Sequence, residues 1–139
     1  QHDYDQDPES FGKSYAGYNG EEESFNLSFK GKQVYIPHLP FFLSEFGGIK
    51  WIPESNRSSA ADNSWGYGDA PATEEEFFTR YEGLTAALLN APNIMGFCYT
   101  QLYDVEQEVN GLYTYARKKK FADYSRIIAA NRKKAAIEE

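Results

Sequence analysis

Two short apolar runs, each followed by polar residues, stand out in the pattern of hydrophobic and polar positions along the chain. The first is "FFLSE" (41–45) and the second is "NIMGFCYTQLYD" (93–104). An unbroken apolar run of this length predicts a strand that is buried on both faces, as in a parallel sheet. Pro37 and Pro40 interrupt the residues before the first run, so that strand is predicted only from Pro40 or Phe41 to Ser44.

A helix is predicted between the two strands. Thr73 and Glu76 form a capping box, and acidic residues fill the first turn. Asn90 and Pro92 end the helix. Its apolar stripe consists of Phe77, Tyr81, Leu84 and Leu88. A second helix is predicted in the tail from Phe121 onward, with Tyr124, Ile127, Ile128 and Ala135 on one side.

The remaining segments, 2–32, 47–72 and 105–121, are rich in Gly, Ser, Asp or Asn and are predicted as long loops. Because a long loop follows the carboxyl end of each strand, the order of elements predicts an α/β fold with a parallel sheet. In barrels that are built from such alternating strands and helices, the catalytic residues lie at the carboxyl ends of the strands. Glu45 closes one predicted strand there, and Gln101 to Asp104 close the other.

Composition narrows the classes of function. The chain has 139 residues, which is the length of a single domain. Aromatic residues make up 17% of the chain, and this content suits a packed interface or stacking on a flat ligand. A net charge of −7 argues against nucleic acid or an anionic membrane as the main partner. No apolar run approaches the ~20 residues that cross a bilayer. The lone Cys98 excludes an internal disulfide and leaves the compartment, cytoplasmic or secreted, undecided.

The sequence lacks the residue spacings that a metal site or a catalytic cysteine requires. Asp3, Asp5 and Asp7 alternate as in a calcium loop, but that loop's glycine and glutamate positions hold Pro8 and Ser14. His2 and His38 have no partner at zinc-ligand spacing. Cys98 with His38 could suggest a thiol protease, but a cysteine inside an apolar strand is more often inert core. We therefore expect no cofactor and no metal.

Two longer stretches carry a resemblance to a known family. "PFFLSEFGG" (40–48) and "IMGFCYTQLYDVEQEVNGLYTYARKKKF" (94–121) resemble the carboxyl-terminal part of the catalytic barrel in glycoside hydrolase family 2. "HDYDQDPESF" (2–11) looks like the segment that follows the sixth strand of that barrel. The resemblance implies that residues 1–139 are the last part of a (β/α)8, or TIM, barrel, including its seventh and eighth strands. It also implies a retaining glycosidase for terminal β-linked sugars, of the β-galactosidase or β-glucuronidase kind.

By this resemblance Glu45 is the catalytic nucleophile, and Tyr4 is the tyrosine that hydrogen-bonds it. Tyr99 occupies an eighth-strand position where relatives often carry a tryptophan under the sugar. Trp65 could supply another stacking face. Gln101 and Asp104 are candidate hydroxyl-binding groups.

From the residues alone, simpler interpretations remain open. Glu45 could be a charge facing solvent at a strand end, and Tyr4 a loop tyrosine packed on its neighbours. Trp65 could anchor its loop, while Tyr99 and Gln101 could pack inside a barrel.

One departure from the family pattern affects the expected activity. The family's general acid/base is a glutamate that usually follows an asparagine, and the chain contains no Asn-Glu pair. The resemblance therefore implies that the acid/base lies in the remainder of a longer parent protein, and that this piece alone is inactive. Its bare strand edges predict self-association, or helices packed over the exposed face. The main alternative is a non-catalytic carbohydrate-binding or interaction domain on a small α/β scaffold.

Overall fold

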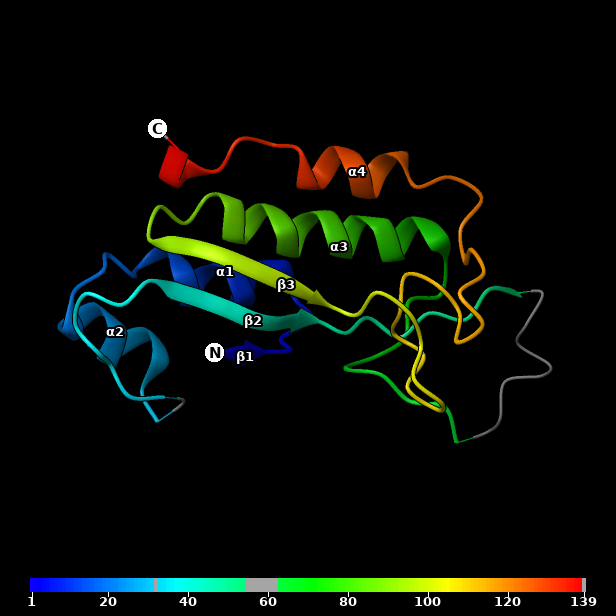
Figure 1. Ribbon diagram of the computed structural model, residues 1–139, viewed down its shortest axis with the longest axis horizontal. Coiled ribbons are helices and arrows are strands. Elements are labelled where there is room, and N and C mark those ends of the chain that lie inside the picture. The colour runs from blue at the N-terminus through cyan, green and yellow to red at the C-terminus, as the bar shows by residue number, and fades with distance from the viewer. Residues whose placement is uncertain (32, 55–62, 139) are drawn as a thin grey trace.

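The computed structural model describes residues 1–31, 33–54 and 63–138, and it shows a small mixed α/β fold (Figure 1). Three strands, β1 (His2–Asp3), β2 (Phe41–Gly47) and β3 (Ile94–Thr100), form one sheet in the order β1-β2-β3. Both pairings are parallel, with His2 beside Glu45 and Phe46 beside Tyr99. The predicted parallel sheet is confirmed. The first predicted strand proved longer than expected, because it continues through Glu45 to Gly47.

The predicted helix after Thr73 is confirmed as α3 (Glu74–Leu89). Thr73 Oγ1 accepts a hydrogen bond from the Glu76 N–H at 3.1 Å, and Glu76 Oε2 accepts one from the Ala72 N–H at 2.8 Å. The first bond satisfies an N–H group that the first turn of a helix leaves without a partner, and the second ties Glu76 back to the residue before the cap. The tail helix, α4 (Ser125–Asn131), is shorter than expected and is followed by a 3-10 turn, Ala136–Glu138.

The prediction of a loop over residues 2–32 is wrong, because this segment contains β1 and two helices, α1 (Pro8–Ala16) and α2 (Glu22–Phe29). Asp7 caps α1 by accepting a hydrogen bond from the Ser10 N–H at 2.8 Å. Pro8 occupies the first turn, where its missing N–H is harmless. Both helices are short and place aromatic side chains one turn apart in the core. These pairs are Phe11 with Tyr15, and Phe25 with Phe29.

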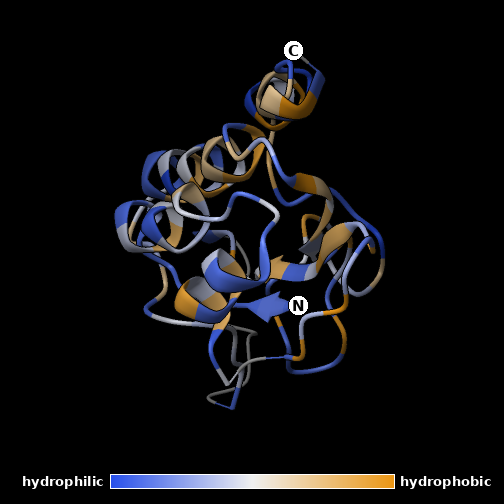
Figure 2. Cartoon of the chain, turned by 90° about the vertical axis from the view of Figure 1, so that its left-hand side faces the viewer, coloured by the Kyte–Doolittle hydropathy of each residue, from blue (hydrophilic) through white to orange (hydrophobic). Residues whose placement is uncertain are grey.

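The helices pack on one face of the sheet. Phe46 of β2 contacts Phe11 of α1, and Tyr99 of β3 contacts Tyr81 of α3, with ring centroids 6.2 and 5.0 Å apart. α4 runs alongside α3 on the side away from the strands (Figure 1). In Figure 2 the helices carry both hydrophilic and hydrophobic residues, as expected for helices that bury one side.

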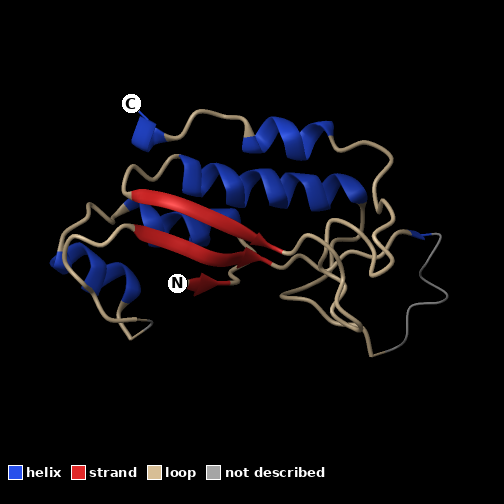
Figure 3. Ribbon diagram, viewed as in Figure 1, coloured by secondary structure: helices blue, strands red, loops and turns tan. Residues whose placement is uncertain are grey.

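The other face of the sheet is open. Phe42 is 50% exposed and Cys98 is also exposed, so the expectation of strands buried on both faces, with Cys98 in the core, is wrong. The loops that follow β2 and β3 gather beyond the carboxyl ends of the strands (Figure 3). The bridge of Trp65 with Glu108 joins the two loops, and the bridge of Ile49 with Tyr67 closes the loop after β2 on itself. The predicted loop over 47–72 includes residues 55–62, which lie outside the described residues.

Candidate active site at the carboxyl ends of the strands

Glu45 lies on the open face, close to the carboxyl end of β2. Leu43 and Phe46 are both completely buried against the helices, because the pairing of β2 with β3 shifts register between them. Glu45, directly before Phe46, points to the opposite face from Phe46. The Glu45 side chain is 40% exposed. The strand therefore delivers the carboxylate to a fixed position that solvent or a ligand can reach.

Tyr4 holds this carboxylate. The residue follows β1 directly, and its hydroxyl donates a hydrogen bond to Oε2 of Glu45. The same hydroxyl lies 3.4 Å from Oγ1 of Thr100, the last residue of β3, so side chains from the ends of three strands meet here. Burial, followed by the hydrogen bond to Glu45, raises the pKa of the Tyr4 phenol above its usual range. A phenol is already protonated at neutral pH, and the raised pKa keeps Tyr4 a hydrogen-bond donor in more alkaline solution as well.

Sequence reasoning missed His2, which also contacts Glu45. Nδ1 of His2 lies 3.1 Å from Oε2 of Glu45, on the same oxygen that Tyr4 binds. Within the described residues, no hydrogen bond is made to Oε1, so one carboxylate oxygen is anchored and the other is available. The spacing of His2 and Tyr4 is a signal that could have identified the pair, because alternate residues of an extended chain share a side.

The ring of Tyr4 packs against the ring of Tyr67. The rings of Tyr4 and Tyr67 are stacked, with centroids 3.4 Å apart and planes 1° from parallel. Gly48 makes this possible: its φ is +63°, and a Cβ there would lie 2.4 Å from the Tyr67 ring and 3.1 Å from the Tyr4 ring. The second glycine after Glu45 is therefore required by close packing as well as by its backbone conformation.

Trp65 extends this aromatic surface. Its ring meets the Tyr67 ring edge to face, with centroids 5.9 Å apart, and its side chain is among the exposed large hydrophobic groups. Backbone hydrogen bonds fix its position, because Trp65 N–H donates to the Gln107 carbonyl and Val109 N–H donates to the Trp65 carbonyl. Tyr4, Tyr67 and Trp65 thus form a continuous run of rings that begins at Glu45.

Tyr99 does not join Glu45 on the open face. Its ring packs in the core against Phe46 and Tyr81, and its hydroxyl accepts a hydrogen bond from the Ile49 N–H at 3.3 Å. Burial raises the pKa of this phenol, as expected for a hydroxyl away from water. The neighbouring Thr100 takes the place beside Tyr4 instead. The expectation that Tyr99 lies beneath a sugar is therefore corrected.

Gln101 and Asp104 are engaged with protein groups. Nε2 of Gln101 donates to Oδ1 of Asn110 at 2.7 Å, so this side chain ties two parts of the loop after β3 together. Asp104 is buried and pairs with Lys120 Nζ at 2.6 Å, and it also accepts the Gly111 N–H at 2.9 Å. Asp104 is thus a structural residue of the loop rather than the hydroxyl-binding group that we expected. Lys120 is sixteen residues away, so the spacing offers no signal for the pair.

The cavities of the described structure lie away from Glu45. Glu45 does not line the cavities beside Gln1, His38, Lys30 or Arg80. Among the described residues, no group of three or more acidic, histidine or cysteine side chains could hold a metal ion. In that same part of the chain, no helix has both the length and the apolar character needed to cross a membrane. Comparison with models of known protein families and with curated proteins found no match to this chain.

Proposed function

We propose that the chain forms the last part of the catalytic barrel of a retaining glycosidase similar to glycoside hydrolase family 2. Its substrates would carry terminal β-linked sugars, with a β-galactoside as the first choice. One observation carries the proposal: a tyrosine hydroxyl donates to the carboxylate of Glu45 where adjacent parallel strands end. The resemblance of "SEFGG" and "HDYDQ" to that family assigns the same relationship to these two side chains, Glu45 and Tyr4.

In the proposed reaction, Oε1 of Glu45 attacks the anomeric carbon of the sugar. A carbon–oxygen bond to Glu45 forms while the bond to the leaving group breaks, and the leaving oxygen takes a proton from a second carboxyl. A water molecule then attacks the same carbon and displaces Glu45. The water gives its proton to the second carboxyl group, which regains its starting state. The hydrogen bond from Tyr4 and the contact with His2 hold Oε2, so the carboxylate keeps the orientation that attack requires.

Aromatic rings beside Glu45 suit a carbohydrate ligand. The apolar face of a sugar ring packs well on aromatic side chains, and the run from Tyr4 through Tyr67 to the exposed Trp65 starts at the nucleophile. Gln101 remains only a candidate for hydroxyl binding, because its amide nitrogen already donates to Asn110. We assign Tyr99 and Asp104 no contact with the sugar.

The proposed parent is a complete (β/α)8 barrel. Parallel strands, helices on one face and loops at the carboxyl ends are the arrangement of such a barrel, whose interior would cover the open face around Phe42 and Cys98. The general acid would come from the remainder of that protein. Loss of a general acid alone lowers rates by roughly 10² to 10⁴-fold, so we expect the isolated chain to be inactive. We propose no nucleic acid or membrane partner.

A second candidate function is a non-catalytic carbohydrate-binding or interaction domain. The exposed ring of Trp65, next to Tyr67, is the observation that favours it. The two functions differ in what the isolated chain does. A binding domain should hold sugars without help, whereas part of a catalytic barrel should bind them measurably only when the rest of the barrel is present. Calorimetric titration of the isolated chain with galactosides separates these outcomes.

The proposed activity is tested in the longer protein with two substitutions. Glu45→Gln keeps the shape of the side chain but removes the nucleophile, so kcat for a nitrophenyl β-glycoside should fall by at least ~10³-fold. Glu106→Gln removes an exposed carboxylate from the loop after β3 and should leave kcat within about twofold of the unchanged protein. Equal activity of the two variants would refute the role of Glu45.

A further inference from the structure

The loops after β2 and β3 are joined edge to edge in a short ladder around Glu108. The Trp65 N–H donates to the Gln107 carbonyl at 2.8 Å, and the Val109 N–H donates to the Trp65 carbonyl at 2.9 Å. On the other side, Val105 and Glu108 exchange two backbone hydrogen bonds, at 3.1 and 2.9 Å. Glu108 is therefore paired with Trp65 on one side and with Val105 on the other.

This pairing places three side chains in one row. Residues that are directly paired in neighbouring extended segments point to the same face. Trp65, Glu108 and Val105 therefore share a face, with the carboxylate between an aromatic and an aliphatic group. Trp65 and Val105 are each 46% exposed and Glu108 is partly exposed, so a ligand can reach all three. We call these three residues the loop row.

The carboxylate of Glu108 is held in a fixed orientation. Nδ2 of Asn110 donates to Oε1 of Glu108 at 2.9 Å. Asn110 is completely buried, and its own oxygen accepts a hydrogen bond from Gln101 at 2.7 Å. Within the described residues, no hydrogen bond is made to Oε2 of Glu108. A buried pair of amides thus anchors one carboxylate oxygen while the other is available to a ligand.

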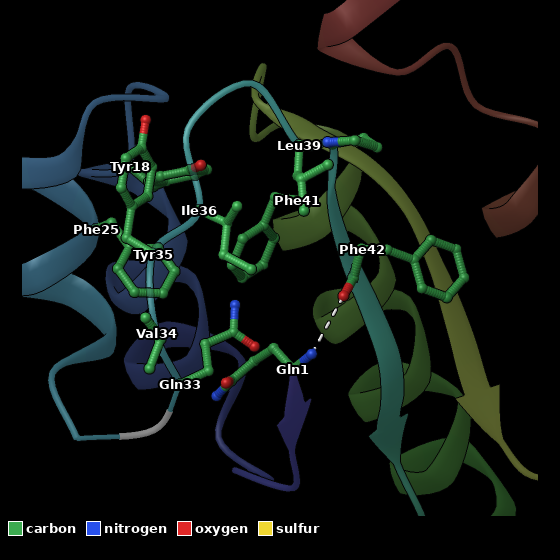
Figure 4. Close-up of a pocket in the computed structure, with 11 residues that line it drawn as sticks. Gln1, Tyr18, Phe25, Gln33, Val34, Tyr35, Ile36, Leu39, Phe41 and Phe42 are labelled. Carbon is green, nitrogen blue, oxygen red and sulfur yellow. Dashed lines mark hydrogen bonds between the residues drawn. The ribbon is translucent and has the colours of Figure 1, made fainter.

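The loop row lies outward from Glu45, where the two loops gather beyond the carboxyl ends of the strands (Figure 3). The rings of Tyr4, Tyr67 and Trp65 are linked by two contacts, with centroids 3.4 and 5.9 Å apart. A sugar ring is similar in size to an aromatic side chain, so Trp65 is placed for a neighbouring sugar and not for the one at Glu45. The cavity in Figure 4 is a separate feature at the start of β2, beside Phe41.

We propose that the loop row is a second sugar-binding subsite, which holds the sugar on the leaving-group side of the bond that Glu45 breaks. The ring of Trp65 packs against the apolar face of that sugar. Oε2 of Glu108 accepts hydrogen bonds from its hydroxyl groups, since a carboxylate only accepts and hydroxyls can donate. The substrates are then β-linked oligosaccharides rather than glycosides with a small leaving group. The leaving-group position rests on the proposed function, whereas the subsite itself rests on the pairing of the loops.

Two matched ligands of the longer protein test the subsite. Methyl β-thiogalactoside contains one sugar, and a thio-linked β-galactosyl disaccharide carries a second sugar in place of the methyl group. Sulfur in the linkage slows hydrolysis, so calorimetric titration can measure Kd for both. Trp65→Ala should weaken disaccharide binding about tenfold or more, but should change Kd for the methyl thiogalactoside less than about twofold. Trp65→Tyr keeps an aromatic ring and should retain most of the disaccharide affinity.

A matched pair of glutamate variants tests the carboxylate. Glu108→Gln keeps an oxygen for Asn110 but makes the acceptor neutral, so disaccharide binding should weaken about fivefold while binding of the methyl thiogalactoside hardly changes. Glu106→Gln removes an equal charge from an exposed position two residues away and should change neither Kd.

Several results would overturn the subsite. The unchanged protein might bind the disaccharide no more tightly than the methyl thiogalactoside, or the Trp65 and Glu108 variants might weaken both ligands equally or neither. An effect of Glu106→Gln as large as that of Glu108→Gln would also refute it. No affinity for either ligand would overturn both the subsite and the proposed function. Full activity of Glu45→Gln would refute the nucleophile alone and leave the differences in affinity intact.

Discussion

Replacing Lys120 by Met tests the structural role that the fold assigns to the end of the loop after β3. The ammonium group of Lys120 donates to Asp104 Oδ1 at 2.6 Å, to the Trp51 carbonyl at 2.8 Å and to the Val109 carbonyl at 3.1 Å. Its side chain is 1% exposed and that of Asp104 is 9% exposed. Methionine fills a similar volume but leaves the buried carboxylate without its counter-charge.

The size of the expected loss of stability follows from the burial of the Asp104–Lys120 ion pair. Removing one partner of a buried ion pair destabilises a protein by about 3–5 kcal/mol, because the remaining charge is left without compensation. Small domains have only about 5–15 kcal/mol of stability in total, so Lys120→Met should remove a large share. An exposed pair is the control. Lys13 and Glu9 of α1 lie 2.6 Å apart with 73% and 79% of their side chains exposed, and Lys13→Met should cost at most about 0.5 kcal/mol.

Urea unfolding followed by circular dichroism measures both variants. We expect a much lower midpoint for Lys120→Met, with an unchanged slope, and a midpoint for Lys13→Met close to that of the unchanged chain. The double variant Asp104→Asn/Lys120→Met removes both charges and should regain at least about 1 kcal/mol over Lys120→Met. If Lys120→Met lost no more stability than Lys13→Met, the buried pair would not have the role assigned to it.

Three other predictions follow from the same contacts. In the active parent, Tyr4→Phe should lower kcat about 10- to 100-fold, since it removes a hydrogen bond to a charged group, whereas the exposed Tyr115→Phe should not. Gly48→Ala should destabilise the chain by about 1–3 kcal/mol in urea unfolding, through its positive φ and the clash with Tyr67. Burial raises the pKa of Tyr15, so the unfolded phenol loses its proton near pH 10 while the folded one keeps it. Stability should therefore fall as pH rises above about 10, and Tyr15→Phe should reduce that slope by up to about 1.4 kcal/mol per pH unit.

Local signals predicted part of the fold. The capping box of Thr73 and Glu76 predicted the start of α3, and the two apolar runs predicted parallel strands. Two helices in residues 2–32 were missed, although Asp7 followed by Pro8 is a helix-start signal. They are short, and their apolar positions are a few aromatic residues among Gly, Ser and Asn, so periodicity over a longer window did not reveal them.

In the candidate site, the sequence predicted only the contact between residues that lie in stretches resembling a known family. The resemblance paired Tyr4 with Glu45, and the structure brings these two side chains together. Which side of β3 faces the site depends on register, and Thr100 rather than Tyr99 lies there. The pairing of Asp104 with Lys120 depends on the path of the intervening loop, which no spacing rule describes.

Covalent labelling of the active parent tests the proposed nucleophile most directly. A 2-fluoro-glycoside slows the second step of a retaining glycosidase, so the sugar remains bonded to the residue that attacked it. Peptide mapping by mass spectrometry should then place the added mass on Glu45, and Glu45→Gln should take up no label. A label on any other residue would contradict the account.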